Sequence, residues 1–221
     1  MNLVFYSGGE AEENLSLDKR LLSLKGKRPL TLTLIPAGSY FAEEYYQDIV
    51  EQYGPLGVSR ILLFNIDQAF SEAFKRAVLR SDIIHLGGGN TFYFLKHLRR
   101  SGMLKELKEW VLGGGVLTGL SAGAIVMTKT IHTASFPDFD RDDNDENLKN
   151  LSAMGLVDFE VFPHYKNSRR YDKELMKYSL EKEGPIYALP DGSGIVLTDE
   201  ELSFVGRSFC FLAGKKYSIH K

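Results

Sequence analysis

One serine stands in the segment of this chain that is best suited to nucleophilic chemistry. Gly119-Leu120-Ser121-Ala122-Gly123 is a G-x-S-x-G pattern between the apolar run 115–118 and the small-residue segment 124–127. This context predicts a strand, a sharp turn and a helix, which would project the Ser121 hydroxyl beyond the edge of a sheet. Backbone N–H groups at the start of such a helix favour negative charge beside them. We therefore expect acyl-transfer chemistry at Ser121.

A serine hydroxyl needs a neighbouring base to become a good nucleophile. His164 follows the apolar run 159–162 and Pro163, so a strand is expected to end just before its imidazole. Open α/β sheets place their active sites at that edge, and we favour His164 as the base over a plain loop histidine. His132 is expected to be a solvated or packing residue. The remaining histidines are expected in a buried strand, on a basic helix and at the chain end: His85, His97 and His220.

The base in turn needs an acid to orient it, and two aspartates are candidates. Asp191 stands in Leu189-Pro190-Asp191-Gly192, just after the apolar run 186–189, although Pro-Asp-Gly is also a simple turn signal. Asp138 stands in the acidic segment 136–150, which we expect to be a mobile surface loop over the site. That segment lacks the glycine and closing glutamate of a calcium-binding loop, so no metal is expected.

A glycine run offers donors for an oxyanion. Gly87-Gly88-Gly89-Asn90-Thr91 follows the apolar run 83–86 and opens a predicted helix. Glycines let the backbone approach a ligand and present consecutive N–H groups. We expect Gly88 and Gly89 to stabilise an oxyanion together with the Ala122 N–H, and Asn90 to contact substrate. Phosphate binding is less favoured, because neither G-K-[ST] nor G-x-G-x-x-G spacing is present.

Alternating apolar runs and amphipathic stretches must position these groups. Strands are predicted at 3–6, 31–36, 61–65, 83–86, 157–162 and 186–189, and helices at 42–53, 68–81, 92–98, 104–112 and 170–182, with short strands to the C-terminus. The pattern is typical of an α/β fold with a mostly parallel sheet and helices on both faces. No repeat or linker divides the chain, so residues 1–221 are expected to form a single domain.

Composition excludes several classes of protein. The 221 residues are 43% apolar and 25% charged, with a net charge of −2 and no basic stripe, so nucleic-acid and membrane partners are not expected. No apolar run of about 18 residues is present, and the N-terminus does not resemble a signal peptide. A cytoplasmic location is therefore expected. Cys210, the single cysteine, is expected to be a small buried hydrophobe.

Four short motifs occur in order along nearly the whole chain: Gly87-Gly88-Gly89-Asn90-Thr91, Gly119-Leu120-Ser121-Ala122-Gly123-Ala124, Pro163-His164 and Leu189-Pro190-Asp191-Gly192. Together they resemble the ordered signatures of the peptidase E and cyanophycinase family of serine peptidases. Tyr6-Ser7-Gly8-Gly9 and Ile35-Pro36-Ala37 fit the same pattern. The resemblance implies a class I glutamine amidotransferase-like fold, a flavodoxin-like three-layer sandwich, in which serine replaces the amidotransferase cysteine.

The resemblance also implies roles and substrates. Ser121 matches the family's nucleophile, His164 its base, and Gly88 and Gly89 its oxyanion glycines. Members hydrolyse bonds after or beside aspartate, in Asp-Xaa dipeptides or in β-aspartyl-arginine units. The acid in the Leu-Pro-acid-Gly turn is usually glutamate, and here it is the shorter Asp191. Some family descriptions place the acid soon after the nucleophile's helix, near Asp138, but Asp191 occupies a motif position and is preferred.

A substrate aspartyl carboxylate would need a cation. Arg169 and Arg170 follow His164 closely and suit bidentate pairing, and Lys166 is a third option. The expected protein is a cofactor-free serine peptidase for small peptides, either monomer or homodimer. An esterase remains an alternative, although the order serine, histidine, acid and the short chain differ from the α/β-hydrolase pattern. A catalytically silent binding protein of the same fold is a further alternative.

Overall fold

A seven-stranded sheet forms the centre of the computed structural model, which describes residues 1–26 and 29–219. Five strands from β3 to β1 run parallel, and β8 and β9 extend this sheet in antiparallel pairing. In spatial order the strands are β3 (Val58–Leu63), β2 (Leu30–Ile35), β4 (Ile83–Leu86), β5 (Val116–Leu120), β1 (Asn2–Tyr6), β8 (Gly194–Leu197) and β9 (Leu202–Val205). The mostly parallel α/β sheet expected from the sequence is thus confirmed.

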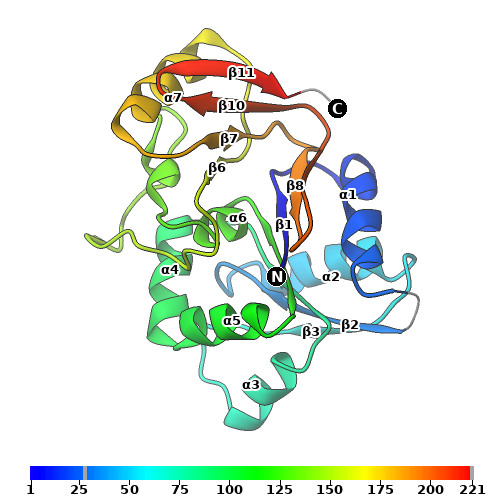
Figure 1. The fold of residues 1–221 in the computed structure, drawn as a ribbon. Helices are drawn as coiled ribbons and strands as arrows, with labels where there is room; N and C mark the ends of the chain where they lie inside the picture. The colour runs from blue at the N-terminus through cyan, green and yellow to red at the C-terminus, as the bar shows by residue number, and fades with distance from the viewer. Residues whose placement is uncertain (27–28, 220–221) are drawn as a thin grey trace.

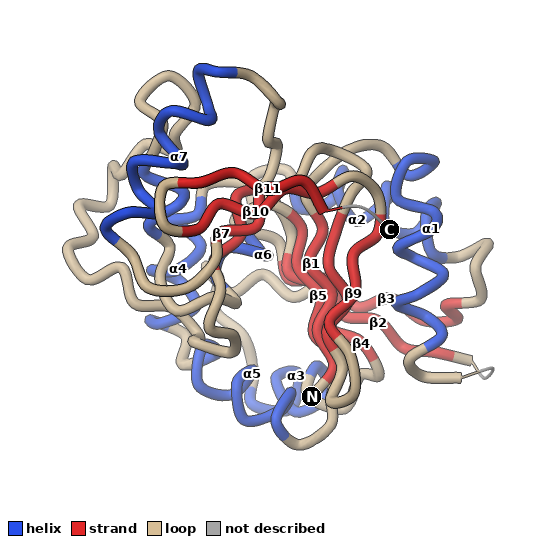
Figure 2. The backbone as a smooth tube through the Cα atoms, turned by 45° about the horizontal axis from the view of Figure 1, so that its top comes forward, coloured by secondary structure: helices blue, strands red, loops and turns tan. Residues whose placement is uncertain are grey.

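Helices cover both faces of this sheet (Figures 1 and 2). On one face lie α1 (Ala11–Ser23) and α2 (Ala42–Tyr53), and on the other α3 (Glu72–Val78), α4 (Thr91–Arg100), α5 (Met103–Leu112) and α6 (Ala122–Val126). The alternation along β1 explains this arrangement, because Leu3 and Phe5 belong to one apolar cluster while Val4 and Tyr6 belong to the other. A strand buried on both faces needs a continuous apolar run rather than an alternating one.

A second sheet of four strands packs above the carboxyl edge of the first (Figure 1). Its order is β11 (Lys215–Ile219), β10 (Ser208–Leu212), β7 (Ile186–Ala188) and β6 (Glu160–Phe162), and α7 (Arg169–Glu181) covers it through a third apolar cluster. The sequence predicted short strands in this half but not that they form a sheet of their own. Strand β6 is also shorter than the predicted 157–162.

Two helices differ from the sequence-based prediction. Helix α1 was not predicted, although Asn14, Leu17, Asp18 and Leu21 have helical spacing and are all buried. Helix α3 covers only part of the predicted 68–81, because the Ser71 hydroxyl caps its start by accepting a hydrogen bond from the Phe74 N–H. The acidic segment 136–150 contains neither helix nor strand, as expected.

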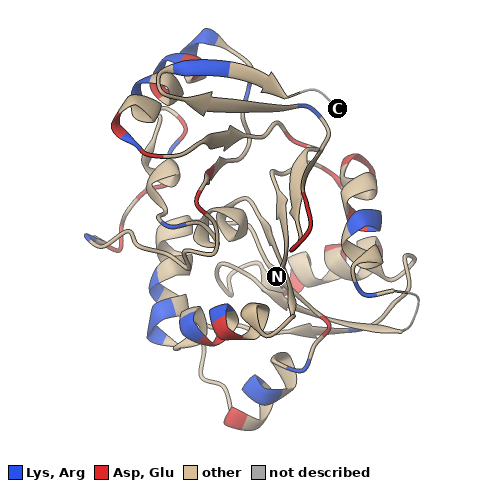
Figure 3. Ribbon diagram, viewed as in Figure 1, with Lys and Arg blue, Asp and Glu red and all other residues tan. Residues whose placement is uncertain are grey.

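Charged residues of both signs are intermixed on the helices in the view of Figure 3. Among the described residues, none of the helices combines the length and the apolar character that a bilayer span requires.

Candidate active site

Ser121 occupies a strained turn between β5 and α6. Its φ of 52° and ψ of −111° are rarely adopted by a residue with a side chain. The Ser121 N–H is held by the Tyr6 carbonyl at 3.0 Å. A Cβ at Gly123 would lie 2.1 Å from the Leu86 carbonyl oxygen, and one at Gly119 would lie 2.3 Å from the Gly123 backbone. The two glycines of the G-x-S-x-G pattern are therefore needed for the close approach of α6 to β4 and β5.

His164 connects Ser121 to Asp191 in a chain of two hydrogen bonds. The His164 Nε2 lies 2.8 Å from the Ser121 Oγ, and the His164 Nδ1 lies 2.8 Å from the Asp191 Oδ1. With the Nδ1 proton donated to the carboxylate, Nε2 is free to accept the hydroxyl proton of Ser121. About half of each of the His164 and Asp191 side chains is exposed, so the chain of bonds is open to a ligand.

Asp138, the other candidate acid, lies elsewhere. Its side chain is 90% exposed and accepts a hydrogen bond from the Arg141 guanidinium at 2.9 Å. Within the described part of the chain, Asp191 is the carboxylate that contacts the His164 ring.

Ser7 directly follows β1 and forms hydrogen bonds with the backbone of the two turns that carry His164 and Asp191. Its Oγ accepts the His164 backbone N–H at 2.8 Å and donates to the Leu189 carbonyl at 2.6 Å. His164 needs this support because its φ is 53°, a left-handed conformation. Next to Ser7, a Cβ at Gly8 would lie 2.3 Å from the His164 Cε1. No role was predicted for Ser7 or Gly8 from the sequence, although both belong to the motif Tyr6-Ser7-Gly8-Gly9.

We expect Ser7→Ala to lower kcat by about tenfold or more, because a buried N–H and carbonyl lose their shared partner and the imidazole shifts. Since Ser7 is fully buried, unfolding stability should also fall by about 1–3 kcal/mol. The measurements are kcat, KM and the pH–rate profile, with thermal unfolding of both proteins. A loss of stability with an unchanged kcat and pH profile would show that Ser7 is structural only.

The glycine run borders Ser121. A Cβ on Gly88 would lie 3.8 Å from the Ser121 Cβ, and Gly89 has a φ of +131° that disfavours any side chain. Burial raises the pKa of the Tyr45 hydroxyl, and the nearby Gly88 backbone lowers it again in part. Ala122 is the first residue of α6, and N–H groups of a first helical turn have no intrahelical acceptor. The Ala122 N–H is therefore available to donate to a ligand beside Ser121.

Comparison with known proteins shows the family of this chain. The profile of Peptidase family S51 matches residues 3–205. The chain belongs to peptidase family S51. An uncharacterized peptidase of Listeria innocua is 30% identical to it over 81% of this chain and 85% of that protein. Peptidase E of Salmonella arizonae is 31% identical over 66% of this chain and 58% of its own length.

A solved structure also resembles this S51 peptidase. The crystal structure of a peptidase E candidate from Listeria monocytogenes EGD-e has a TM-score of 0.73 and 26% identity, covering 92% of this chain and 97% of that one. The flavodoxin-like α/β fold and the family expected from the sequence are confirmed, and the protein is a serine peptidase.

A cavity of about 470 Å³ opens at Ser121 of this S51 peptidase. Ser121, His164 and Arg141 line it, together with Phe136 and Phe139. Within the described part of the chain, Arg141 is the arginine that lines the cavity, next to Asp140 and Asp142, and no role was predicted for it from the sequence. Its only signal in the sequence was a lone arginine within the acidic segment.

The cations expected from the sequence lie further out. Arg170 stacks over the Phe139 ring at 3.2 Å from its centroid, so it lies one ring away from the cavity. Arg169 is exposed at the start of α7, and Lys166 is exposed before it. Within the described part of the chain, the residues that line the cavity include neither Arg169 nor Lys166.

The Asn90 side chain is engaged in holding the backbone. Its Oδ1 accepts the Tyr93 N–H at 2.9 Å and so caps α4, while its Nδ2 donates to the Asp143 carbonyl at 2.8 Å. It thereby links the glycine run to the acidic segment, at the edge of a second cavity.

The other histidines and the cysteine lie outside the chain of hydrogen bonds at Ser121. His132 packs against the rings of Phe136 and Tyr178, and His97 against Tyr93. His220 lies outside the described residues. Burial raises the pKa of the half-buried Cys210 thiol, which disfavours the reactive thiolate. No group of three metal-ligating side chains occurs in the described residues.

His85 is buried in β4, where its Nε2 lies 3.2 Å from the Tyr45 hydroxyl. Burial lowers the pKa of His85 from 6.5 to about 4. Below pH 6.5 the His85 imidazole binds a proton in the unfolded chain, whereas in the folded chain it stays neutral down to about pH 4. The free energy of unfolding therefore has its full value above pH 6.5 and falls as the pH drops from 6.5 toward 4. We expect wild type to lose about 2.5 kcal/mol more unfolding free energy than His85→Gln between pH 8 and 4.5. Urea titrations measure these free energies, and equal losses in wild type and His85→Gln would contradict the prediction.

Proposed function

We propose that this S51 peptidase hydrolyses small peptides containing aspartate through an acyl-enzyme formed on Ser121. The observation that carries the proposal is the hydrogen-bonded chain from Asp191 through His164 to Ser121, with both bonds at 2.8 Å. Nucleophile, base and orienting acid in this order are what acyl transfer by serine requires.

In the proposed reaction the Ser121 Oγ attacks the scissile carbonyl while the His164 Nε2 takes its proton. The resulting imidazolium donates that proton to the leaving amine as the C–N bond breaks. Water then attacks the acyl-enzyme, giving one proton to Nε2, and the C–O bond to Ser121 breaks as the proton returns to the serine. Asp191 accepts the Nδ1–H throughout, which fixes the tautomer and stabilises the positive ring.

The oxyanion of the tetrahedral intermediate would lie between the glycine run and α6. The backbone N–H groups of Gly88, Gly89 and Ala122 are the proposed donors. Fixed backbone donors stabilise developing charge without reorganisation, and one such donor contributes on the order of 3 kcal/mol to the barrier.

Preference for aspartate would come from cations beside Ser121. Arg141 lines the same cavity as Ser121 and His164, and its present partner Asp138 is exposed and easily replaced. The carboxylates of Asp140 and Asp142 line this cavity too, and they accept hydrogen bonds from the Tyr171 hydroxyl and the Thr91 N–H. Arg170, held flat on Phe139, adds positive charge at the rim. A substrate carboxylate paired with Arg141 would place its neighbouring carbonyl at the nucleophile.

Hydrolysis of a panel of Asp-Xaa and Ala-Xaa dipeptides, with a β-aspartyl-arginine dipeptide, tests the proposal. We expect cleavage of the aspartyl peptides by wild type and none by Ser121→Ala. Cleavage of p-nitrophenyl esters alone would make the protein an esterase, and inertness to the panel and to serine-directed phosphonates would make it a silent binding protein. Either result would overturn the proposal.

A further inference from the structure

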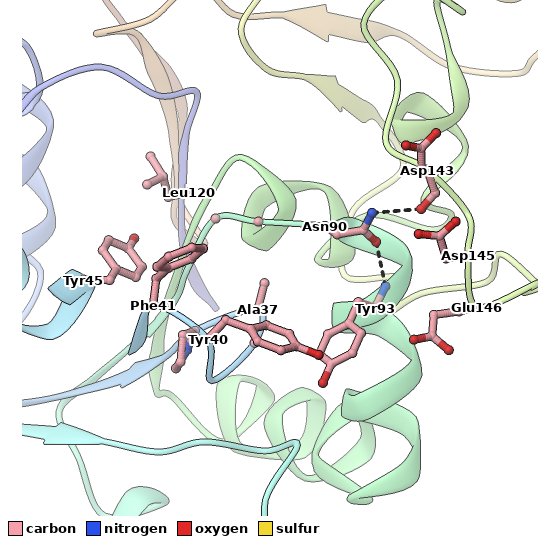
Figure 4. Close-up of a pocket in the computed structure, with 14 residues that line it drawn as sticks. Ala37, Tyr40, Phe41, Tyr45, Asn90, Tyr93, Leu120, Asp143, Asp145 and Glu146 are labelled. Atoms are coloured by element: carbon pink, nitrogen blue, oxygen red, sulfur yellow. Dashed lines mark hydrogen bonds between the residues drawn. The ribbon is translucent and has the colours of Figure 1, made fainter. Parts of the chain in front are cut away.

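A third cavity, of about 460 Å³, lies between the start of α1 and α2, at the carboxyl ends of β1 and β5. Its volume is within the range of small-molecule sites. It shares Tyr45 and Leu120 with the second cavity, and Figure 4 shows both across that cavity from the acidic segment 136–150. None of the described residues that line the third cavity lines the cavity at Ser121. The two are therefore separate sites.

Three side chains at the floor of the third cavity direct their donors to one buried carboxylate. The Tyr6 and Tyr53 hydroxyls donate to the Asp18 Oδ1 at 2.8 Å and 3.0 Å. The Gln52 amide donates to the Oδ2 of the same carboxylate at 2.9 Å. Because these donors are used within the protein, the groups that the floor leaves to a ligand are mainly oxygen acceptors.

Asn14 adds an acceptor that lacks a partner. Its side chain lines the cavity and is only 3% exposed. The Asn14 Nδ2 donates to the Gly9 carbonyl at 3.0 Å, whereas its buried Oδ1 has no hydrogen-bond partner within residues 1–26 and 29–219. A buried polar atom without a partner is costly. A ligand that donates a hydrogen bond to this oxygen would therefore be stabilised.

The mouth of the third cavity is acidic. Four exposed carboxylates line it, while the described lining residues include neither lysine nor arginine: Glu10, Glu12, Asp48 and Glu51. Glu10 belongs to the capping box that begins α1. For the other three carboxylates, no hydrogen bond or ion pair is found in the described part of the chain. His85 also lines the cavity but adds no positive charge at neutral pH, because burial lowers its pKa to about 4.

This combination of groups fits a small organic cation. An alkylammonium ion has three N–H donors and no acceptor, so it complements the Asn14 oxygen and the carboxylates. Tyrosine ring faces attract such cations, and an alkyl chain packs on them. An anion would be repelled by the four carboxylates, a neutral alcohol would leave their charge uncompensated, and a metal ion would make no use of the aromatic lining.

We propose that the third cavity binds a small alkylammonium ion, with its head at Asn14 and its chain against the rings of Tyr6 and Tyr53. The ligand is a free small molecule rather than part of the peptide substrate, because the proposed function places the substrate in the cavity at Ser121. The proposal does not depend on peptidase activity, so binding is measured whether or not any peptide is cleaved.

Titration of isotope-labelled wild type with butylammonium chloride, followed by NMR, tests the site. We expect saturable shifts of the Asn14 side-chain amide and of the backbone amides of 10–14, with a Kd on the order of 1 mM. Binding of n-butanol, which keeps the chain and removes the charge, should be about tenfold weaker or less detectable still. Shifts that do not saturate, or equal affinity for n-butanol, would overturn the proposal.

Two variants test the residues that carry the proposal. Asn14→Leu removes the unpartnered oxygen and should weaken butylammonium binding by about tenfold. Thermal unfolding checks its fold, because Asn14 also holds the Gly9 carbonyl. Glu12→Gln/Glu51→Gln leaves the buried floor intact and should weaken binding by about three- to fivefold. Unchanged affinity in the double variant, or in a folded Asn14→Leu protein, would overturn the site.

Two controls separate this site from other attractions for a cation. Glu200→Gln/Glu201→Gln makes the same change in net charge at the exposed turn between β8 and β9, away from the cavity lining, and should bind butylammonium as wild type does. Arg141→Ala alters the cavity at Ser121 and should also keep the wild-type affinity. A change of more than about threefold in either control would place the binding elsewhere and overturn the proposal.

Discussion

Ser121→Ala is expected to lower kcat on aspartyl dipeptides by on the order of 10⁵ to 10⁶, leaving only the background from binding and the oxyanion donors. The loss is large because in the proposed mechanism the Ser121 Oγ forms the covalent intermediate, and its hydroxyl is the proton donor that lies 2.8 Å from the His164 Nε2. Folding should be unaffected, since alanine carries the same Cβ in the strained turn as serine. Rates should be measured with the dipeptide panel.

Ser218→Ala, at an exposed serine on β11, serves as the matched control and should keep wild-type rates. Circular dichroism and thermal unfolding of both variants would separate loss of chemistry from loss of fold. Turnover by a pure, folded Ser121→Ala protein within about tenfold of wild type would rule out serine catalysis at this position.

Asp191→Asn is expected to lower kcat by about 10³ to 10⁴ with a small effect on KM. The asparagine amide cannot balance the positive charge on the His164 ring, and its NH₂ group would favour the tautomer that places the ring proton on Nε2, facing Ser121. Nε2 would then no longer accept the serine proton. The measurement is kcat across pH 5 to 9, where the variant should recover part of its rate at high pH through hydroxide.

Asp138→Asn provides the comparison that decides between the two acids. Because the Asp138 carboxylate is 90% exposed and contacts Arg141 rather than His164, we expect its kcat to stay within about threefold of wild type. A loss at Asp138 as large as that at Asp191 would mean that the acidic segment closes on the base during catalysis and supplies the acid.

The sequence alone predicted those helices and strands whose formation depends on residues close together in the chain. The apolar runs of β1, β2 and β4 and the amphipathic α2 follow from periodicity alone, and the turn at Ser121 follows from two glycines that allow α6 to approach β4 and β5 closely. Helix α1 was missed because its buried stripe includes the polar residues Asn14 and Asp18, whose burial depends on partners distant in the sequence: Tyr6, Gln52 and Tyr53 bond to Asp18.

Only the tertiary structure decided which of these residues meet. Pro-Asp-Gly at 190–192 is locally indistinguishable from a solvent turn, and its contact with His164 is created when Ser7, 157 residues before the histidine, binds both turns. The cavity lined by Tyr40, Phe41 and Tyr93 likewise joins the segment after β2, the start of α4 and the acidic segment. The sequence by itself determined the reactive residue types, the sheet that carries them and the family. Long-range packing decided which carboxylate faces His164 and where charge gathers beside Ser121, because those contacts join segments that local patterning cannot relate.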